Sequence, residues 1–314
     1  MVDQRRSSTT IPRAEVVETP RAPRRRRSVI ARLTPWLFLA IPLAFLLTFT
    51  FVPAANLFFY SLTKWDGFSS DKQFVGQENY VELFTRPELF QVFFVSLFYL
   101  ASGVVQMVLA LYFATVLSFN VRFRNFFKGV MFFPYLINGV AIGFIFLYFF
   151  QPGGTLDSVL HLVGVHGQHL WLGDPGIVNW SLASVSLWRY TGLNFVLFLG
   201  AIQSIPAEIY EAAEIDGANR WHQVRYLILP GIRPVISLSA ILVVSGSLSV
   251  FEIPYIMTGG AGGSTTFVIQ TIKLAFEFNK VGLASAAAVV LLGIVMLATW
   301  IQRRIVPDEG VDLV

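Results

Sequence analysis

Five long stretches of the chain contain no aspartate, glutamate, lysine or arginine. These stretches cover residues 33–63, 89–121, 129–156, 234–251 and 281–302. A helix that crosses a bilayer needs about 20 mainly apolar residues. Four of the stretches are long enough, and 234–251 becomes so if it continues through Glu252 to Met257. A sixth apolar stretch, about 181–205, contains Arg189. The pattern predicts an all-α membrane protein with six transmembrane helices.

Composition supports this class and excludes others. Hydrophobic residues make up 55% of the 314 residues and charged residues only 13%, which is unlike an ordinary soluble domain. The sequence contains no cysteine, so disulfides and thiolate metal sites are excluded.

The distribution of basic residues predicts the orientation of the chain. If the amino terminus is cytoplasmic, four segments lie on the cytoplasmic side: 1–33, 120–128, 206–234 and 303–314. In this order they hold nine, three, three and two of the 23 basic residues. The opposite loops hold only Lys64, Lys72, Arg86, Lys273 and Lys280. Basic residues accumulate on the cytoplasmic side of membrane proteins, so we expect both termini to be cytoplasmic.

The basic run "RAPRRRRSVIARL" (Arg21–Leu33) allows three interpretations. The apolar run that follows is too long for a signal peptide, and no basic-aromatic fold that would bind nucleic acid follows it. We therefore expect a disordered basic cytoplasmic tail over 1–33, a transmembrane domain over 34–304 and a short cytoplasmic tail over 305–314.

A polar segment interrupts the apolar sequence between the fourth and fifth predicted spans. Its first half predicts a helix with Ser204 as N-cap, Pro206 in the first turn and Glu208 at the positive end of the helix dipole. We expect this helix to run to about Asp216 and to stop at Gly217, because a glycine tolerates the left-handed conformation of a C-terminal cap.

The second half of the segment predicts a short amphipathic helix. Trp221, Val224 and Ile228 recur at helical spacing, and Pro230 and Pro234 are expected to end this helix. Such an element could rest on the lipid surface, or its tryptophan-led stripe could dock into a groove of a cytoplasmic partner. The residues alone leave these two alternatives open.

The segment "EAAEIDGA…LP" resembles the EAA motif of binding-protein-dependent ABC importer permeases. The stretches "FVGQENYVELF", "FFPYLINGVAIGF", "WLGDP", "LWRYTGLNFVLFLGAIQSIPAEIYEAA" and "YIMTGG" are similar to the carbohydrate-uptake branch, which serves maltose, lactose and glycerol-3-phosphate. The resemblance covers nearly all of 34–304 and implies a type I ABC importer permease fold. It also implies that residues 206–234, here called the coupling element, dock onto an ATP-hydrolysing subunit.

The resemblance implies the residues of this docking surface. They are Glu211, Ala212, Ala213, Asp216, Gly217, Ala218, Leu229 and Pro230, joined by Trp221 and by Val224, where the family usually has phenylalanine. The same resemblance implies a second permease subunit, two ABC ATPase subunits and an external solute-binding protein as partners.

Nothing in the sequence indicates an enzyme. "GGAGGSTT" (Gly259–Thr266) lacks the lysine of a phosphate-binding P-loop, so we expect a flexible loop there, no cofactor in this chain, and ATP and Mg²⁺ used by the partner ATPase. His161, His166 and His169 have loosely metal-like spacing but no nearby closed set of Asp, Glu or Cys ligands, so they are interpreted as solvated loop histidines rather than as a metal site.

Ionisable residues inside predicted spans are candidates for a substrate pathway. Arg189 and Glu252 lie at similar predicted depths; they could pair with each other, or one or both could line a translocation cavity. Aromatic and amide side chains that suit sugar hydroxyls add further candidates, namely Tyr135, Asn138, Trp188, Tyr190, Asn194 and Tyr255.

The hypothesis from sequence is a permease subunit of an ATP-driven sugar importer in the bacterial plasma membrane. The alternative is a self-sufficient six-helix channel or ion-coupled carrier, which would be expected to bury several acidic residues in its spans. Only Glu252 is evident there.

Overall fold

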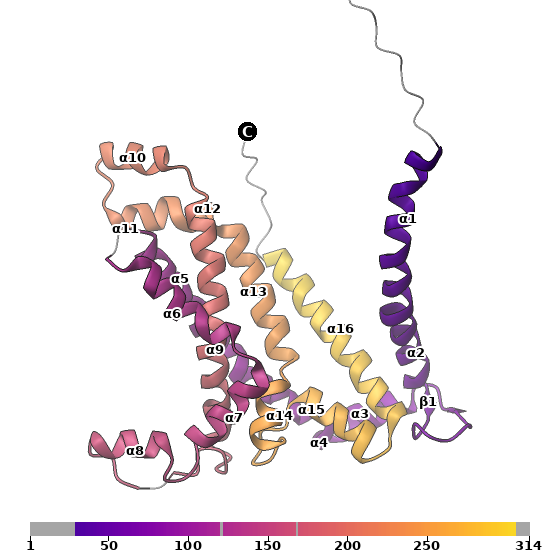
Figure 1. Ribbon diagram of the computed structural model, residues 1–314. Coiled ribbons are helices and arrows are strands. Elements are labelled where there is room, and N and C mark those ends of the chain that lie inside the picture. The colour runs from indigo at the N-terminus through magenta and orange to yellow at the C-terminus, as the bar shows by residue number, and fades with distance from the viewer. Residues whose placement is uncertain (1–28, 120–121, 168, 306–314) are drawn as a thin grey trace, which may run out of the picture. The chain divides into compact units, whose positions relative to one another are not determined.

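The computed structural model describes residues 29–119, 122–167 and 169–305. The chain divides into two compact units, 1–53 and 54–314 (Figure 1). The first unit contains α1 (Val29–Leu46), the π-helical segment η1 (Leu47–Phe51) and the start of α2 (Val52–Ser61).

The helix α1 includes the last five residues of the segment predicted to be a disordered tail. Residues 29–33 are helical, because the sequence after the arginine run, "VIARL", contains no helix breaker and continues directly into the apolar stretch. The rest of the predicted tail, 1–28, lies outside the described residues, as does most of the predicted tail 305–314.

The second unit is built from helices of very different lengths and one two-stranded antiparallel sheet, β1–β2. Its elements after α2 are β1 (Thr63–Lys64), β2 (Gln73–Phe74), α3 (Glu78–Thr85), α4 (Pro87–Phe90), η2 (Gln91–Phe94), α5 (Val95–Ser118), α6 (Arg124–Leu136), α7 (Gly139–Phe149), α8 (Thr155–Leu162), α9 (Val178–Gln203), α10 (Ala207–Ile215), α11 (Arg220–Gln223), η3 (Val224–Ile228), α12 (Leu229–Gly231), α13 (Arg233–Leu248), α14 (Glu252–Thr258), α15 (Phe267–Ile272), η4 (Lys273–Glu277) and α16 (Val281–Ile305).

Five helical segments are long and apolar enough to cross a membrane. They are Trp36–Ser61, Pro87–Ser118, Val178–Gln203, Arg233–Thr258 and Val281–Arg304. A sixth crossing exists if the pair α6 and α7 counts as one span, although the two helices meet at an angle of 95°. The predicted apolar stretches therefore become helices, with one of them sharply bent.

The bend between α6 and α7 corrects the prediction of a single helix for the apolar stretch 129–156. Ile137 adopts an extended conformation (φ −73°, ψ 135°), and the side-chain oxygen of Asn138 accepts a hydrogen bond from the N–H of Val140. Asn138 thus caps a new helix instead of continuing the old one, as asparagine commonly does. Hydropathy does not detect this break because apolar residues continue on both sides of it.

The predicted fifth span also differs from the structure. It was expected to run through Glu252 as one helix, but α13 ends at Leu248 and α14 starts at Glu252 after a short non-helical connection, 249–251. Glu252 therefore lies in the first turn of α14, where a carboxylate is favoured by the helix dipole.

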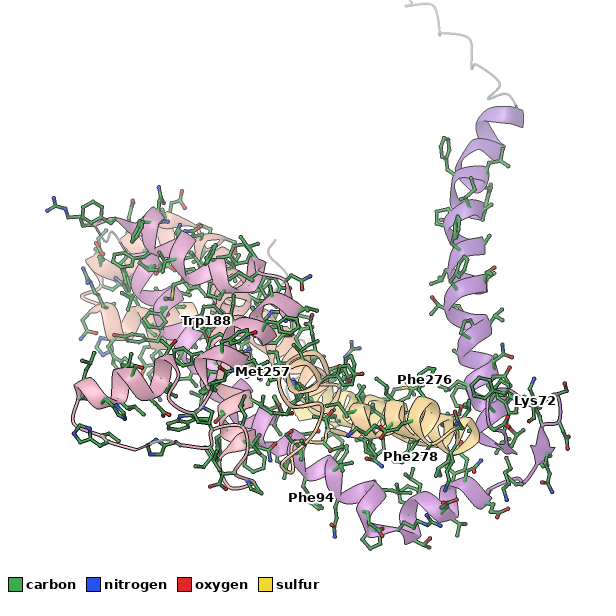
Figure 2. The ribbon with its side chains drawn as sticks, turned by 60° about the horizontal axis from the view of Figure 1, so that its bottom comes forward. Lys72, Phe94, Trp188, Met257, Phe276 and Phe278 are labelled. Carbon is green, nitrogen blue, oxygen red and sulfur yellow. The ribbon has the colours of Figure 1, made fainter. Side chains whose placement is uncertain are left out.

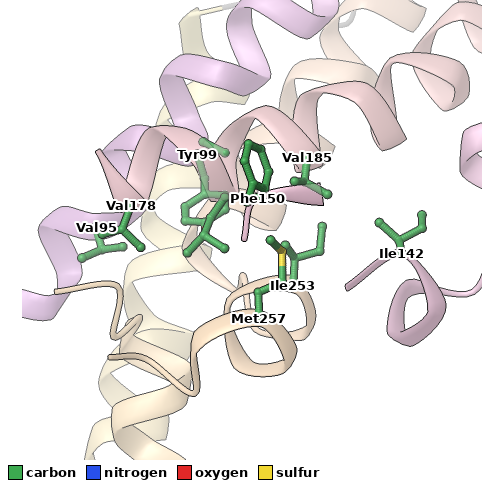
Figure 3. Packing of buried hydrophobic residues seen from close by; sticks show 10 residues of the cluster. Val95, Tyr99, Ile142, Phe150, Val178, Val185, Ile253 and Met257 are labelled. Carbon is green, nitrogen blue, oxygen red and sulfur yellow. The ribbon is translucent and has the colours of Figure 1, made fainter. Parts of the chain in front are cut away.

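The core of the second unit lies where α5 packs along α9. One buried cluster joins Val95 and Tyr99 of α5 to Val178 and Val185 of α9, and it reaches α14 through Ile253 (Figure 3). The hydroxyl of Ser102 donates a hydrogen bond to the carbonyl of Ala183 across the two helices (3.1 Å). By contrast, aromatic side chains such as Phe94 and Phe276 project outward and are exposed (Figure 2), as expected where lipid or another subunit covers a helix.

The loop Gly259–Thr266 is not the flexible segment that its glycines predicted. Four of its glycines have positive φ, but side-chain hydrogen bonds fix the turn. Thr265 Oγ1 donates to the Gly260 carbonyl (2.6 Å), and Thr266 Oγ1 donates to the Val250 carbonyl (2.9 Å). Ser264 and Thr266 are buried, so the loop is packed into the fold.

The segment between α7 and α9 is organised by Asp157, a buried carboxylate on α8. It accepts hydrogen bonds from the Gly153 N–H (2.7 Å) and the Trp171 indole (2.8 Å), and His169 Nδ1 lies 3.4 Å away. His169 is therefore a partner of Asp157 and not the solvated loop histidine that was predicted. Among the described residues, no three His, Cys, Asp or Glu side chains are grouped so that they could hold a metal ion.

The hydrogen bonds to Asp157 predict a pH-dependent contribution to stability. The Gly153 N–H and then the Trp171 indole lower the pKa of this carboxyl to about 2, against the raising effect of burial. Because the pKa is lower when folded, the carboxylate stabilises the fold fully above about pH 4 and loses this effect as the pH falls towards 2. We expect Asp157→Asn to lower the thermal unfolding midpoint by a few degrees at pH 7, with the gap to the wild type narrowing between pH 4 and 2. A gap that stays constant over this range would contradict the assignment.

Candidate functional site: a polar cavity and a two-helix element

A cavity of about 430 Å³ lies between α5, α9, α13 and the start of α14. Its walls are mostly apolar, with small and polar side chains spaced along the helices. The lining residues are Tyr99, Ser102, Gly103, Gln106, Ser186, Tyr190, Leu193, Asn194, Leu242, Val243, Gly246, Ser247, Ser249, Val250, Phe251, Glu252 and Ile253.

Three polar side chains in this lining have buried oxygens without a hydrogen-bond partner. They are the Tyr99 hydroxyl, the Ser186 hydroxyl and the Asn194 Oδ1, and the three residues are only 4%, 6% and 2% exposed. A buried polar group without a partner is unfavourable, and such groups commonly mark a place where a ligand or water binds. The cavity is therefore equipped to bind a molecule that offers hydrogen bonds.

The structure brings three of the predicted pathway residues to the cavity and leaves the others outside its lining. Tyr190, Asn194 and Glu252 line it. Asn138 instead caps α7, and Tyr135 contacts the ring of Tyr190 with 6.3 Å between centroids.

Trp188 and Tyr255 are also absent from the cavity lining. Trp188 lies against Phe146 with 5.2 Å between ring centroids, within the helical unit (Figure 2). Tyr255 stacks on Phe251 at 4.8 Å. Both aromatic side chains therefore have packing partners of their own, which is the common role of such residues in helical membrane proteins.

Arg189 and Glu252 form an ion pair. Arg189 Nη1 lies 2.8 Å from Glu252 Oε2, and the arginine side chain is 12% exposed against 42% for the glutamate. The sequence left open whether these two residues pair or line a cavity. In the structure they pair, and Glu252 also lines the cavity. The arginine is not among the lining residues and sits behind the glutamate.

The ion pair also touches the bend between α6 and α7. Arg189 Nη2 donates to the carbonyl of Ile137 at 3.4 Å, the residue at which α6 has ended. A Cβ on Gly139 would overlap the Glu252 carboxylate, so this glycine allows α14 to approach the bend. One ion pair thus joins α9, α14 and the broken helix.

Sequence reasoning missed the contribution of α5 to the cavity. Tyr99, Ser102 and Gln106 line one wall, and their spacing of three and four residues places them on one face of a helix. Their recurrence inside a charge-free, membrane-length stretch was the available signal, because a polar stripe in an apolar helix indicates a protected face.

The coupling element contains α10 and α11, which lie at the opposite end of α9 from α7, α8 and α14 (Figure 1). The helix α10 ends as predicted near Asp216, and Gly217 has a φ of +79°. The Gly217 N–H donates to Glu214 and the Ala218 N–H donates to Ala213, which closes the helix with its terminal carbonyls satisfied.

The start of α10 differs from the prediction. Ser204 is not its N-cap, because the Ser204 hydroxyl donates to the Ala201 carbonyl (2.8 Å) at the end of α9. Pro206 occupies the capping position instead, and the helix begins at Ala207.

The second half of the element is not the single amphipathic stripe that was predicted. Trp221 is 65% exposed, but Ile228 is fully buried and packs with partly buried Val224 against the α5–α9 core. The reason is the π-helical turn η3, which changes the direction in which successive side chains point. Pro230 does not end the helix either, since α12 continues to Gly231.

The predicted docking residues are thus divided by exposure. The exposed ones are Glu211, Ala212, Asp216, Gly217, Trp221 and Pro230, while Ala213, Ala218, Val224 and Leu229 are half-buried. The exposed set is open to solvent in this chain.

Comparison with known proteins places the chain among transport proteins. The protein named "Probable ABC transporter permease protein YurN" of Bacillus subtilis is 34% identical over 280 residues, which is 87% of this chain and 96% of that protein. The diacetylchitobiose uptake system permease protein NgcF of Streptomyces coelicolor is 32% identical over 313 residues, covering 92% of this chain and 88% of its own length.

A solved structure shares the fold. The bacterial alginate ABC transporter, in complex with an alginate pentasaccharide-bound periplasmic protein, contains a chain that matches with a TM-score of 0.76 and 22% identity, over 90% of this chain and 99% of its own.

Membrane-length helices around a cavity that carries a few polar groups are the architecture of an integral membrane protein. The chain belongs to the family described as binding-protein-dependent transport system inner membrane component, whose model matches residues 106–310. It is accordingly a multi-pass protein of the inner membrane. Nothing in these comparisons supports a self-sufficient channel or carrier.

Proposed function

We propose that this chain is a permease subunit of an ATP-driven ABC importer that translocates a sugar delivered by an external binding protein. The observation that carries the proposal is the cavity between α5, α9 and α13, with its unpartnered buried polar groups, in a chain of the binding-protein-dependent family. The relatives named for diacetylchitobiose uptake and other saccharide transport support a sugar as the cargo.

The proposed topology has six spans with both termini in the cytoplasm. The bent pair α6–α7 serves as one span, which brings the five long helices to six. This arrangement places the coupling element on the side with most basic residues, as the distribution of charge in membrane proteins requires.

The proposed partners follow from what this chain lacks and what it presents. Its sequence contains no P-loop motif, so we assign ATP and Mg²⁺ to two separate ABC ATPase subunits. The exposed residues Glu211, Asp216 and Trp221 are the proposed contact with one of them. A second, homologous permease subunit would close the cavity, and an external solute-binding protein would deliver the sugar.

In this proposal the ATPase moves the bundle through the coupling element. Ile228 and Val224 are packed against the core of α5 and α9, while Trp221 is exposed. A displacement imposed at the exposed face is therefore passed by direct contact to the helices that line the cavity.

Replacing Gly217 tests the docking part of the proposal. A φ of +79° is not accessible to proline, which also lacks the N–H that bonds to Glu214. We expect Gly217→Pro to reduce the amount of P-loop ATPase that co-purifies from native membranes in mild detergent by about tenfold, which corresponds to about 1.4 kcal/mol of binding free energy.

Gly217→Asn is the matched control, because asparagine tolerates the left-handed region, and it should retain the ATPase. The proposal fails if the intact wild-type protein brings down no ATPase, or if the proline variant retains as much as the wild type.

A further inference from the structure

Within this chain, the charge of the cavity lining is set by one residue. Among the lining residues that the structure describes, Glu252 alone belongs to the aspartate, glutamate, lysine, arginine and histidine group. Arg189 is not among the lining residues. Its Nη1 donates to Glu252 Oε2 (2.8 Å) and its Nη2 to the Ile137 carbonyl (3.4 Å), while its buried Nε has no hydrogen-bond partner. The cavity lining of this chain therefore presents a carboxylate and no cation.

An anionic ligand would meet an unfavourable environment in this cavity. Moving a carboxylate or phosphate from water into a mostly apolar site is strongly unfavourable unless a cation or several donors compensate it. Here the Arg189 guanidinium is already paired, and the Glu252 carboxylate would repel a second anion. Phosphorylated and uronic sugars are disfavoured for the same reason.

The other polar groups suit a ligand rich in hydroxyls. Asn194 Oδ1 is a pure acceptor and lacks a donor, while the hydroxyls of Tyr99 and Ser186 can both donate and accept. A sugar hydroxyl can likewise donate to one group and accept from another. Leu193, Val243 and Ile253 offer apolar surface beside these groups, which fits the C–H faces of a sugar ring.

We propose that the cavity binds an uncharged saccharide and excludes sugar phosphates and uronates. Glu252 sets this preference through its own carboxylate and by forming an ion pair with Arg189. The inference rests on the proposed function, because it takes the cavity as the place where the imported sugar passes. It goes further by naming the charge class of that sugar and the residue that decides it.

The test measures ligand contact directly by saturation-transfer difference NMR. The complex that co-purifies with the full chain is placed in nanodiscs and washed free of soluble binding protein. The probes are N,N′-diacetylchitobiose and maltose, which are neutral, and digalacturonate and glycerol-3-phosphate, which are anionic. The method detects weak binding, so the selectivity of the external binding protein does not enter the result.

Two variants test whether the sugar binds in this cavity and whether Glu252 sets the charge preference. Gly246→Trp places a bulky side chain at the cavity wall, at a position that Gly246 lines and where an added Cβ meets no atom within 4 Å. Glu252→Gln removes the carboxylate charge and releases Arg189 from its ionic partner. The amide of glutamine keeps the shape of the side chain.

We expect the wild-type complex to give a signal with at least one neutral probe and to bind both anionic probes about tenfold more weakly or not at all, a difference of about 1.4 kcal/mol. Gly246→Trp should abolish the neutral signal. Glu252→Gln should raise the signal of the anionic probes.

Each contrary outcome has its own meaning. Wild-type binding of digalacturonate or glycerol-3-phosphate as strong as that of the neutral sugars would overturn the charge assignment and leave the proposed function standing. An anionic signal unchanged by Glu252→Gln would remove Glu252 as the determinant. If no saccharide of either charge binds, or if Gly246→Trp leaves the neutral signal intact, the cavity is not a sugar pathway and the proposed function itself fails there.

Discussion

Gly192→Ala is expected to destabilise the protein by about 3 kcal/mol, at the upper end of what overpacking a helix contact produces. Gly192 lies on α9 where α6 crosses it. A Cβ at this position would overlap the carbonyl oxygen of Met131 and lie 3.2 Å from Phe132 Cα. Both obstacles are backbone atoms, so no side chain can rotate away, and the two helices must separate.

The same helix supplies a matched control. A Cβ at Gly200 meets no atom within 4 Å, so Gly200→Ala removes a flexible residue from a helix interior without a clash. We expect it to be neutral or to stabilise by about 0.5–1 kcal/mol. Thermal unfolding of the detergent-solubilised protein would compare the two variants. Equal midpoints for both would show that α6 and α9 do not approach each other as closely as described.

Breaking the Arg189–Glu252 ion pair is the second change with a large expected effect. Arg189→Met leaves the Glu252 carboxylate and the Ile137 carbonyl without their donors. Removing one partner of a fully buried pair costs about 3–5 kcal/mol. Because Glu252 is 42% exposed, solvent compensates part of this, and we expect about 2 kcal/mol. Sugar uptake should fall as well, since the bend between α6 and α7 loses the hydrogen bond from Arg189 to the Ile137 carbonyl.

A double-mutant cycle separates the pair from the individual side chains. Arg189→Met/Glu252→Gln removes both charges and should recover part of the stability lost in Arg189→Met, because no uncompensated carboxylate remains. The pair Arg86–Glu82 is a control: its atoms are 3.2 Å apart and Arg86 is 56% exposed, so Arg86→Met should cost only about 0.5 kcal/mol. A full additive loss in the double variant would contradict the pairing.

The extent to which sequence predicts this protein depends on the kind of information required. Membrane-length apolar stretches are a property of composition, and they located the five long candidate spans within a few residues. The turn at Gly217 was predictable because only glycine among the common residues adopts its conformation at little cost. Both features are local, so a single sequence contains them.

What the sequence could not predict depends on neighbours distant in the chain. The break at Ile137 and Asn138 is stabilised by a hydrogen bond from Arg189, about fifty residues away. Glu252 packs against it only because Gly139 has no side chain. Likewise, Tyr99 and Ser186 become a site only because α5 lies along α9. Periodicity reports which face of one helix is polar, and it does not report which helix that face meets.

The π-helical turn Val224–Ile228 has a consequence for how this region tolerates changes in length. A π-turn holds one residue more than an α-turn, and each residue advances an α-helix by about 100°. Deleting one residue inside the turn would leave a regular α-helix of nearly the same length. A deletion just outside the turn would instead rotate Ile228 out of the core or turn Trp221 to a different face of the element. Among natural variants of this chain, single-residue insertions and deletions in the coupling element should therefore concentrate within these five positions.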